Sequence, residues 1–559
     1  MIQAFCVSRL HNKTRIYAYI LRDTTGKEIT VSAEQLKDAI VNKKIEIVNL
    51  TLTSDNRLIE KEYENKSLFY KPKEQSPIEK FINKAKILGC SIKEVRTYCK
   101  HKVYFALRNG YNILYIPDSV TEIDKSGTND EYLKTISSLD GTLKVIGGDN
   151  LQSAARLFLR CSAKAIDLSK LNTSKVISMK SMFEKCHATK IDLSNIDTSN
   201  VTNMKSMFDE CHVEEIDLST FDTHNLTTTR LMFHDCRAQK INLTNFHTSN
   251  VTDMYAMFSM CKVESLDLSS FDTSKVTIMT YMFNLCSVKE LDLSNFDTSL
   301  VYDMKRLFGN CKLTSLNIST FNTSKVKTMQ HMFAECEIPN LDLSNFDTSN
   351  VTNMEGMFEL CITNKLDLYN FNTSKVKNMG SMFRLCSINK LNISSFNTSN
   401  VFSMKSMFEN CSLEDIDFSH FNTSNVLDMS YMFHFCKIER LDLSKFDTSA
   451  VINMHSMFRH TNIPFLNLSS FDTTNVINMQ SMFDGAETHE LDLSNFNTLK
   501  CKDFGFMFRN FKAYRLDISK FKFSDSAISI DMFANIDIKS INLPSDVDSS
   551  FYKKLYLTM

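Results

Sequence analysis

Residues 266–286, LDLSSFDTSKVTIMTYMFNLC, are one copy of the unit that decides the fold. The same pattern returns every 25 residues from Ile166 to Ile541 without an insertion, which gives sixteen copies. A fixed period of this length is the mark of a solenoid, in which each unit packs on its neighbours. Leucines open six successive copies and cysteines close them, at Leu266, Leu291, Leu316, Leu341, Leu366 and Leu391 and at Cys261, Cys286, Cys311, Cys336, Cys361 and Cys386.

Each copy begins with the alternation of a short strand. Leu266 and Leu268 lie on one face of that strand and the intervening polar residues on the other, so we expect the leucines to face the core. Phe271 follows at a turn, and phenylalanine occupies this position in thirteen consecutive copies, from Phe221 to Phe521. The recurrence predicts an internal stack of rings. Residues 272–274, Asp-Thr-Ser, supply turn chemistry and a helix cap.

The second half of each copy has the spacing of a helix. The apolar residues at positions 276, 279, 282, 283 and 286 fall on one face of a helix of about three turns. A parallel strand and a helix in each copy predict an α/β fold, a right-handed leucine-rich-repeat-like solenoid of about 16 repeats. Helices need more room than strands, so we expect the solenoid to curve with its sheet on the concave side.

The residues before the repeats form two further blocks. Strand signals at 15–21 and 44–52 flank a helical stretch at 33–41, and a second block carries a helix at 78–88 and strands at 102–107 and 111–116. We therefore expect five parts: a small α+β module at 1–62, a linker at 63–77, an α/β block and amino-terminal cap at 78–142, the repeat solenoid at 143–543, and a carboxy-terminal cap at 544–559.

Composition limits the classes of partner. The 64 Lys and Arg residues and 65 Asp and Glu residues nearly cancel, which argues against nucleic acid and anionic membranes as partners. The sequence has no apolar run long enough for a membrane span and no secretory signal at its start. Twelve of the 16 cysteines occur once per repeat, as small buried apolar residues would, so we expect free thiols and a cytoplasmic location.

Residues 341–354, LDLSNFDTSNVTNM, and 182–186, MFEKC, resemble the repeats of BspA-like leucine-rich-repeat proteins of bacteria. The resemblance covers the whole array, and the lead-in at 143–148 is similar to uncharacterised members without a signal peptide. It implies a binding or adhesion role, often at the cell surface, and offers no catalytic residues. This chain departs from the pattern by lacking an export signal, a lipid-attachment cysteine near its start and a wall anchor. The alternative function is therefore an extracellular adhesin, delivered to the surface or secreted by a non-classical route.

The outward strand position is Asp or Asn in all sixteen copies. Carboxylates stacked at about 4.8 Å repel one another, so this concave strip could bind cations. Alternatively, the asparagines and nearby lysines such as Lys365 and Lys390 relieve the repulsion and the strip is structural; we favour that interpretation. From Asp192 the order runs Asp, Asp, Asn, as in Asp267, Asp292, Asn317, Asp342, Asp367 and Asn392.

Positions that vary within the strict repeat are the candidates for binding a protein partner. A repeat surface changes there without disturbing the core, and aromatic and arginine residues are typical of interaction hot spots. Ordinary variation of a solvated surface is the competing interpretation. On the sheet side the candidates are Tyr369, Arg440, Phe465, Glu490 and Arg515; on the expected helix side they are Tyr255, Tyr281, Arg306, His331, Tyr431, Phe435 and His455.

No catalytic, cofactor or metal site is expected. Thr461, Ala486, Phe511 and Ile536 replace the repeated cysteine in later copies, which a metal array would not tolerate. Cys90, Cys99 and His101 lack zinc-finger spacing. Nucleotide-binding loops and hydrolase motifs are missing, and the whole chain has only 12 glycines. The sequence predicts a non-enzymatic solenoid that recognises a macromolecule.

Overall fold

The computed structural model describes residues 75–97, 99–123, 131–411, 416–437, 441–524 and 526–545 with their side chains. Before residue 75 it describes the backbone of five strands. The chain divides into two compact units, Met1–Ile92 and Lys93–Met559. The expected helix at 33–41, most of the expected strand at 44–52 and nearly all of the expected carboxy-terminal cap lie outside the described residues.

The first unit contains a five-stranded antiparallel sheet of order β3-β2-β1-β5-β4. The strand expected at 15–21 is confirmed as part of β2, and β5 pairs with β1 from within the segment assigned to a linker. The helix α2, Pro77–Ile87, begins where the sequence predicted, with a capping box between Ser76 and Glu79. The strands are β1 (Ile2–His11), β2 (Thr14–Arg22), β3 (Glu28–Val31), β4 (Ile45–Glu46) and β5 (Phe69–Pro72).

A six-stranded sheet leads into the repeats. The two strands expected at 102–107 and 111–116 are confirmed as β7 and β8, and the structure pairs them antiparallel. From β8 onward the pairing is parallel, so β9, β10 and β11 carry this sheet into the first coils of the array. The elements are β6 (Ser91–Arg96), β7 (Lys102–Arg108), β8 (Tyr111–Ile116), α3 (Glu131–Ile136), β9 (Thr142–Gly147), β10 (Ala165–Leu171) and β11 (Lys190–Asp192).

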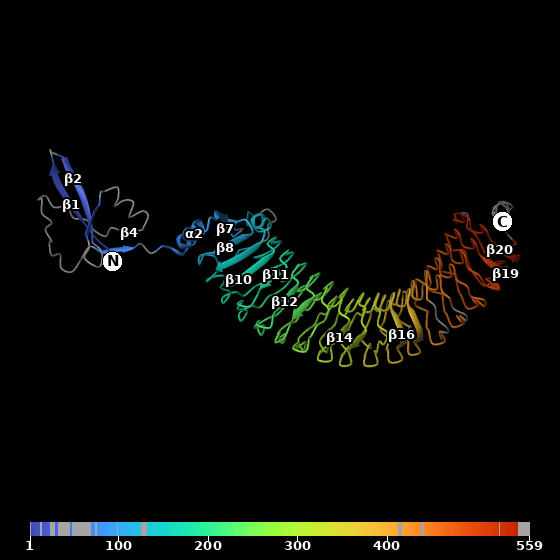
Figure 1. Ribbon diagram of the computed structural model, residues 1–559. Helices are drawn as coiled ribbons and strands as arrows, with labels where there is room; N and C mark the ends of the chain where they lie inside the picture. The colour runs from blue at the N-terminus through green and yellow to red at the C-terminus, as the bar shows by residue number, and fades with distance from the viewer. Residues whose placement is uncertain are drawn as a thin grey trace. The chain divides into compact units, whose positions relative to one another are not determined.

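The repeats form a β-solenoid, and Figure 1 shows its coils stacked one on the next. Strand residues pair in parallel with residues exactly one coil later, as Leu291 pairs with Leu316. The strands are short, and in the coils at 264–268 and 339–343 none is formed. The remaining strands are β12 (Glu215–Asp217), β13 (Lys240–Asn242), β14 (Glu290–Asp292), β15 (Ser315–Asn317), β16 (Ile362–Asp367), β17 (Ser387–Asn392), β18 (Glu490–Asp492), β19 (Lys512–Asp517) and β20 (Asp537–Asn542).

The helix expected in each repeat is not formed, so the α/β description was wrong. Residues 276–286 make a chain of turns instead, because Tyr281 and Leu285 have φ angles of 61° and 59°, which end any right-handed helix. The N–H of Met282 bonds within the coil to Met279, whereas those of Tyr281 and Phe283 donate to carbonyls of the next coil, at 2.9 and 3.0 Å. The backbone is satisfied between coils rather than along a helix.

The burial inferred from the helical spacing is nevertheless correct. Val276, Met279, Met282 and Phe283 are fully buried and Cys286 nearly so. The apolar spacing therefore predicts which side chains face the core. It does not distinguish a helix from a chain of turns that buries the same positions.

Two columns of phenylalanine rings fill the core. The expected stack is confirmed, since Phe271 lies 5.8 Å from Phe246 and 6.3 Å from Phe296, with near-parallel planes. A second stack runs unbroken through every coil from Phe158 to Phe533 with centroids 5.1–6.0 Å apart. Rings at this separation pack by offset stacking, so both columns tie successive coils together.

A buried threonine column adds a polar tie. The Thr273 hydroxyl is buried and donates to the Asp297 carbonyl of the next coil at 2.9 Å, and Thr298 does the same to Asn322. The residue before it makes the expected turn, because Asp272 Oδ1 accepts the Ser274 N–H at 3.0 Å. The Asp-Thr-Ser segment thus combines a local turn with a bond between coils.

Candidate binding surfaces

The Asp/Asn strip is built from turns within each coil. A side-chain oxygen of Asp267 accepts the N–H of Ser269 at 3.0 Å, and the same bond follows Asp292 and Asp342. Hydrogen bonds from the serine hydroxyl and N–H lower the pKa of these three carboxyls. The asparagines make the same contact, at Asn317 and Asn392.

Asparagine also links neighbouring members of the strip. The Asn392 amide donates to Asp367 at 2.8 Å, and the Lys365 ammonium lies 3.0 Å from the same carboxyl. The hydrogen bond from Lys365 is the largest cause that lowers the pKa of Asp367. Within the described residues no group of three or more His, Cys, Asp or Glu side chains is placed to hold a metal ion. The visible role of the strip is to fix turns, and cation binding stays a prediction.

The sheet-side candidates separate into two places. Phe465, Glu490 and Arg515 follow one another in the strand column, where Phe465 is 75% exposed and Arg515 lies 3.6 Å from Asp517. Tyr369, 59% exposed, belongs to a coil farther toward the amino terminus. Arg440 lies outside the described residues.

The other candidates fall on two columns of left-handed residues. In each coil a first left-handed position, such as Tyr281, is followed four residues later by a second, such as Leu285. We call these the left-handed columns; they contain Ser181 and Lys185 and the residues 25 apart from each. Tyr281, Arg306, His331 and Tyr431 belong to the first column and Phe435 to the second, while Tyr255 and His455 directly precede the first.

This placement was not readable from the sequence. A left-handed residue other than glycine costs roughly 1–2 kcal/mol, so glycine or asparagine is the usual signal. Here glycine occupies the columns only at Gly356 and Gly485, and the backbone bonds between coils hold the other residues of the columns in the same backbone conformation.

Aromatic residues meet at two places beside the columns. The rings of Tyr255 and Tyr281 are 5.7 Å apart, and the Arg230 guanidinium lies 3.8 Å above the Tyr255 ring. Farther along, Phe435 stacks on His460 at 4.7 Å and remains 46% exposed.

The same later coils bring two further residues together. The Tyr431 hydroxyl lies 2.7 Å from His455 Nε2. His460, for its part, covers Gly485, where a Cβ would lie 2.2 Å from its Nδ1 atom. Of the predicted residues, Tyr431 thus contacts His455 directly, and His434 links it to Phe435, with ring centroids 5.4 Å from Tyr431 and 4.5 Å from Phe435.

A ladder of ion pairs runs beside these aromatic residues and was missed by the sequence reasoning. Arg384 bridges Glu359 at 2.7 Å and Glu409 at 3.1 Å, and His434 lies 3.3 Å from Glu409. Burial raises the pKa of Glu409, but the hydrogen bonds from His434 and Ser406 and the charge of Arg384 outweigh it and lower the pKa to about 2. The signal was the alternation of charge at 25-residue steps.

A second set of ion pairs, at the same position in later coils, surrounds a fully buried carboxylate. Arg459 and Arg509 approach Asp484 to 2.9 and 2.6 Å, and they satisfy a charge that would be costly in the interior alone. Burial raises the pKa of Asp484, and the two arginines more than reverse this, leaving it below its usual value.

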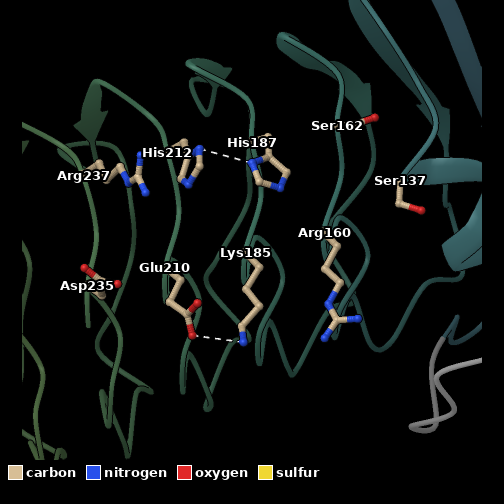
Figure 2. A pocket seen from close by; sticks show the side chains of 9 residues that line it. All are labelled: Ser137, Arg160, Ser162, Lys185, His187, Glu210, His212, Asp235 and Arg237. Atoms are coloured by element: carbon tan, nitrogen blue, oxygen red, sulfur yellow. Dashed lines mark hydrogen bonds and ion pairs between the residues drawn. The ribbon is translucent and has the colours of Figure 1, made fainter.

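A hollow of about 460 Å³ lies over the first coils of the array, and it too was missed. Figure 2 shows its walls: Lys185 pairs with Glu210 at 3.1 Å, and the Nδ1 atoms of His187 and His212 lie 3.2 Å apart. Burial is the largest cause that lowers the pKa of His212. The lining residues are Ser137, Arg160, Ser162, Lys185, His187, Glu210, His212, Asp235 and Arg237.

The repeated thiols are buried in the core of the coils. The Cys311 thiol donates to the Phe283 carbonyl at 3.0 Å, and Cys336 repeats the contact one coil later. The described cysteines are free, and burial raises the pKa of Cys286 to about 11. They pack against the phenylalanine stack.

Comparison with known proteins identifies the repeats. A family model described as "Mycoplasma protein of unknown function, DUF285" matches seven overlapping stretches, at 152–267, 238–337, 260–367, 282–391, 329–440, 361–462 and 434–545. No curated protein and no solved structure matches the chain. Among the described residues, no helix is long and apolar enough to cross a membrane.

Proposed function

Because this chain belongs to the DUF285 family, whose description names no activity, we propose its function from its surface: a non-enzymatic scaffold that binds another protein through the left-handed columns. Within this proposal the repeats are also a variety of the BspA-like leucine-rich repeat, supported by their shared LDLS, FDTS and MF-xx-C elements.

One observation carries the proposal. Along the first left-handed column φ stays between 48° and 61°, while the side chain changes from Ser181 to Tyr281, Arg306, Tyr431 and Asp531. A constant backbone that presents different side chains is how repeat proteins build specific surfaces. The core beneath is nearly invariant, so selection for packing does not account for these differences.

The coils around Phe435 are the strongest part of this surface. Phe435 is half-exposed, and two histidine rings pack against it: the His460 ring stacks on it at 4.7 Å and the His434 ring lies 4.5 Å away. Exposed aromatic rings that lose little freedom on binding are typical interface anchors. We therefore assign Phe435 and Tyr431 as the central contacts.

The test compares capture of a stoichiometric partner from native lysate by the full-length chain and by a double variant, Tyr431→Ser with Phe435→Asn. Both replacements occur in these columns one coil away, at Ser406 and Asn410, so the fold should be kept. Leu285→Asn, a half-exposed member of the second column, is the matched control. We expect the wild type and the control to retain the partner and the double variant to lose it. Equal capture by all three, or none by the wild type, rejects the proposal.

The proposal includes a cytoplasmic location. Support comes from the free, buried thiols of the array, which a reducing compartment keeps in that state. Fractionation of the native cell tests it: recovery only from the surface or the medium would replace the scaffold with the adhesin alternative.

A further inference from the structure

A third column, the residue that follows the buried position of Val276 in each coil, contains an unusual run. The column is mostly threonine or lysine, as at Thr252 and Lys327. In four consecutive coils it is apolar and open to solvent, with Phe402 45%, Leu427 44%, Ile452 40% and Ile477 42% exposed. We call these four residues the apolar stripe. Contiguous exposed apolar groups on a polar column are a mark of an interaction site.

The stripe lies on a continuous ladder of backbone hydrogen bonds between coils. The N–H of Leu427 donates to Phe402, that of Ile452 to Leu427 and that of Ile477 to Ile452, each at 2.9 Å. The residue before each member, from Val401 to Val476, is fully buried in the core. Four side chains therefore stand in line at the spacing of paired strands, about 4.8 Å, over a length of about 14 Å.

Lysines bound the stripe at both ends. Lys377 occupies the column one coil before Phe402, and Lys502 one coil after Ile477; both are exposed. A second copy of this chain is a poor occupant, because two stripes paired about a two-fold axis would set Lys377 of one copy against Lys502 of the other. The charges select a partner with acidic groups at both ends of an apolar segment.

The spacing selects the conformation of that segment. Side chains on one face of a helix recur about every 5.4 Å, against about 4.8 Å between stripe residues. Over the three intervals of the stripe, the mismatch adds up to about 2 Å. Side chains on one face of an extended strand recur every ~6.8 Å, so the mismatch with the stripe reaches about 6 Å over the same three intervals. A change of side-chain rotamer cannot compensate for that distance. Only the helix keeps four contacts in register.

We propose that the apolar stripe binds an amphipathic α-helix of another protein, with apolar residues along the stripe and acidic residues near both ends. Lys377 and Lys502 are five coils apart, about 24 Å, which corresponds to a helix of about 16 residues. This site shares no residue with the left-handed columns and goes beyond the function proposed for them.

The probe is a fluorescent 17-residue helical peptide with leucine at positions 3, 7, 10 and 14 and glutamate at both ends. Fluorescence anisotropy measures its binding to the full-length chain and to the stripe variant, Phe402→Thr, Leu427→Thr, Ile452→Thr and Ile477→Thr. Threonine fills the same column at Thr202, Thr227 and Thr277, so the variant should keep its melting temperature. The matched control, Ile177→Thr with Tyr302→Thr, removes the exposed apolar residues of the column outside the stripe.

We expect a dissociation constant on the order of 10 µM for the wild type and the control, and binding at least about tenfold weaker for the stripe variant. A lysine-ended peptide should bind at least about fivefold more weakly than the glutamate-ended one, with the difference shrinking at high salt. The Tyr431→Ser, Phe435→Asn variant should bind the peptide as the wild type does, which keeps the two proposals separable.

Three results overturn the inference: undetectable binding to the wild type at 1 mM chain, equal binding to the stripe variant, or no preference for acidic ends. Sedimentation supplies a fourth, because self-association of the wild type that the stripe variant loses would make a second copy the occupant.

Discussion

The Asp/Asn strip and the left-handed columns run along the same coils but use their side chains differently. In the strip, Asp267 and Asp342 bond to the backbone of their own turn, and the residue type hardly changes. In the columns, the backbone is held by bonds to the next coil, and side chains such as Arg306 and Tyr431 vary. The residue type is therefore constant at positions where the side chain itself stabilises the coil. It varies at positions where only backbone hydrogen bonds stabilise the coil.

The largest expected effect tests this division by comparing a core residue with a column residue two coils later. Phe308 is fully buried in the long ring stack, so Phe308→Ala should destabilise the array by about 3–5 kcal/mol. Leu360 is equally apolar but 39% exposed in the second left-handed column, and Leu360→Asn should change stability by less than about 0.5 kcal/mol. Urea denaturation followed by circular dichroism measures both. Similar losses for the two variants would erase the distinction between core and column.

The second set of ion pairs offers an intermediate effect. Asp484→Asn removes the buried charge between Arg459 and Arg509 and should lower stability by about 2 kcal/mol, because hydrogen bonds to charged groups are the strong ones. Asp472 carries out only the local turn, accepting the Thr474 N–H at 2.9 Å, and Asn497 fills its position one coil later. The control Asp472→Asn should therefore cost less than about 0.5 kcal/mol. A larger loss from Asp472→Asn would contradict this ranking.

Much of this organisation was readable from the sequence, and the limit is physical. Period, burial and the ring stack at Phe271 all follow from side-chain type, which the repeat displays sixteen times. The helix was mispredicted because Tyr281 and Leu285 are ordinary residues for a helix, and their left-handed conformation is imposed by bonds to residues 24 positions away. Local propensity has no access to such bonds.

The candidate sites divide along the same line. Tyr431, Phe435 and His455 were singled out because they vary; Tyr431 contacts His455, and Phe435 is connected to Tyr431 through the ring of His434. The Arg384 ladder and the hollow around His187 went unnoticed because each residue is unremarkable by itself. Reading every position in steps of 25 residues would have exposed both, since side chains one period apart are neighbours in space.

The ladder also predicts a dependence on pH. The pKa of Glu409 is lowered to about 2 in the folded chain, against about 4.3 for an unperturbed glutamate. Its contribution to stability is present above the unfolded pKa and is lost as the pH falls from about 4.3 through 2. Glu409→Gln should therefore be less stable than the wild type at pH 7, and the difference in stability should shrink toward pH 2.5. The midpoints of urea denaturation measure this difference. A constant gap across that range would show that Glu409 acts by shape alone.

The smallest effect bears on the strain of the columns themselves. Leu285, with φ of 59° and 39% of its surface exposed, should carry about 1–2 kcal/mol of left-handed strain that glycine lacks. Glycine also gives the unfolded chain more conformational freedom, which costs about 0.5–1 kcal/mol of stability. Because relief of the strain exceeds this cost, Leu285→Gly should stabilise the array by about 0.5 kcal/mol. Leu300 is exposed to the same extent without a positive φ, so Leu300→Gly should destabilise it by about 0.5–1 kcal/mol. Opposite signs in thermal denaturation would show that the bonds between coils impose the left-handed turn on residues that resist it, whereas the same sign for both would mean that the columns are unstrained.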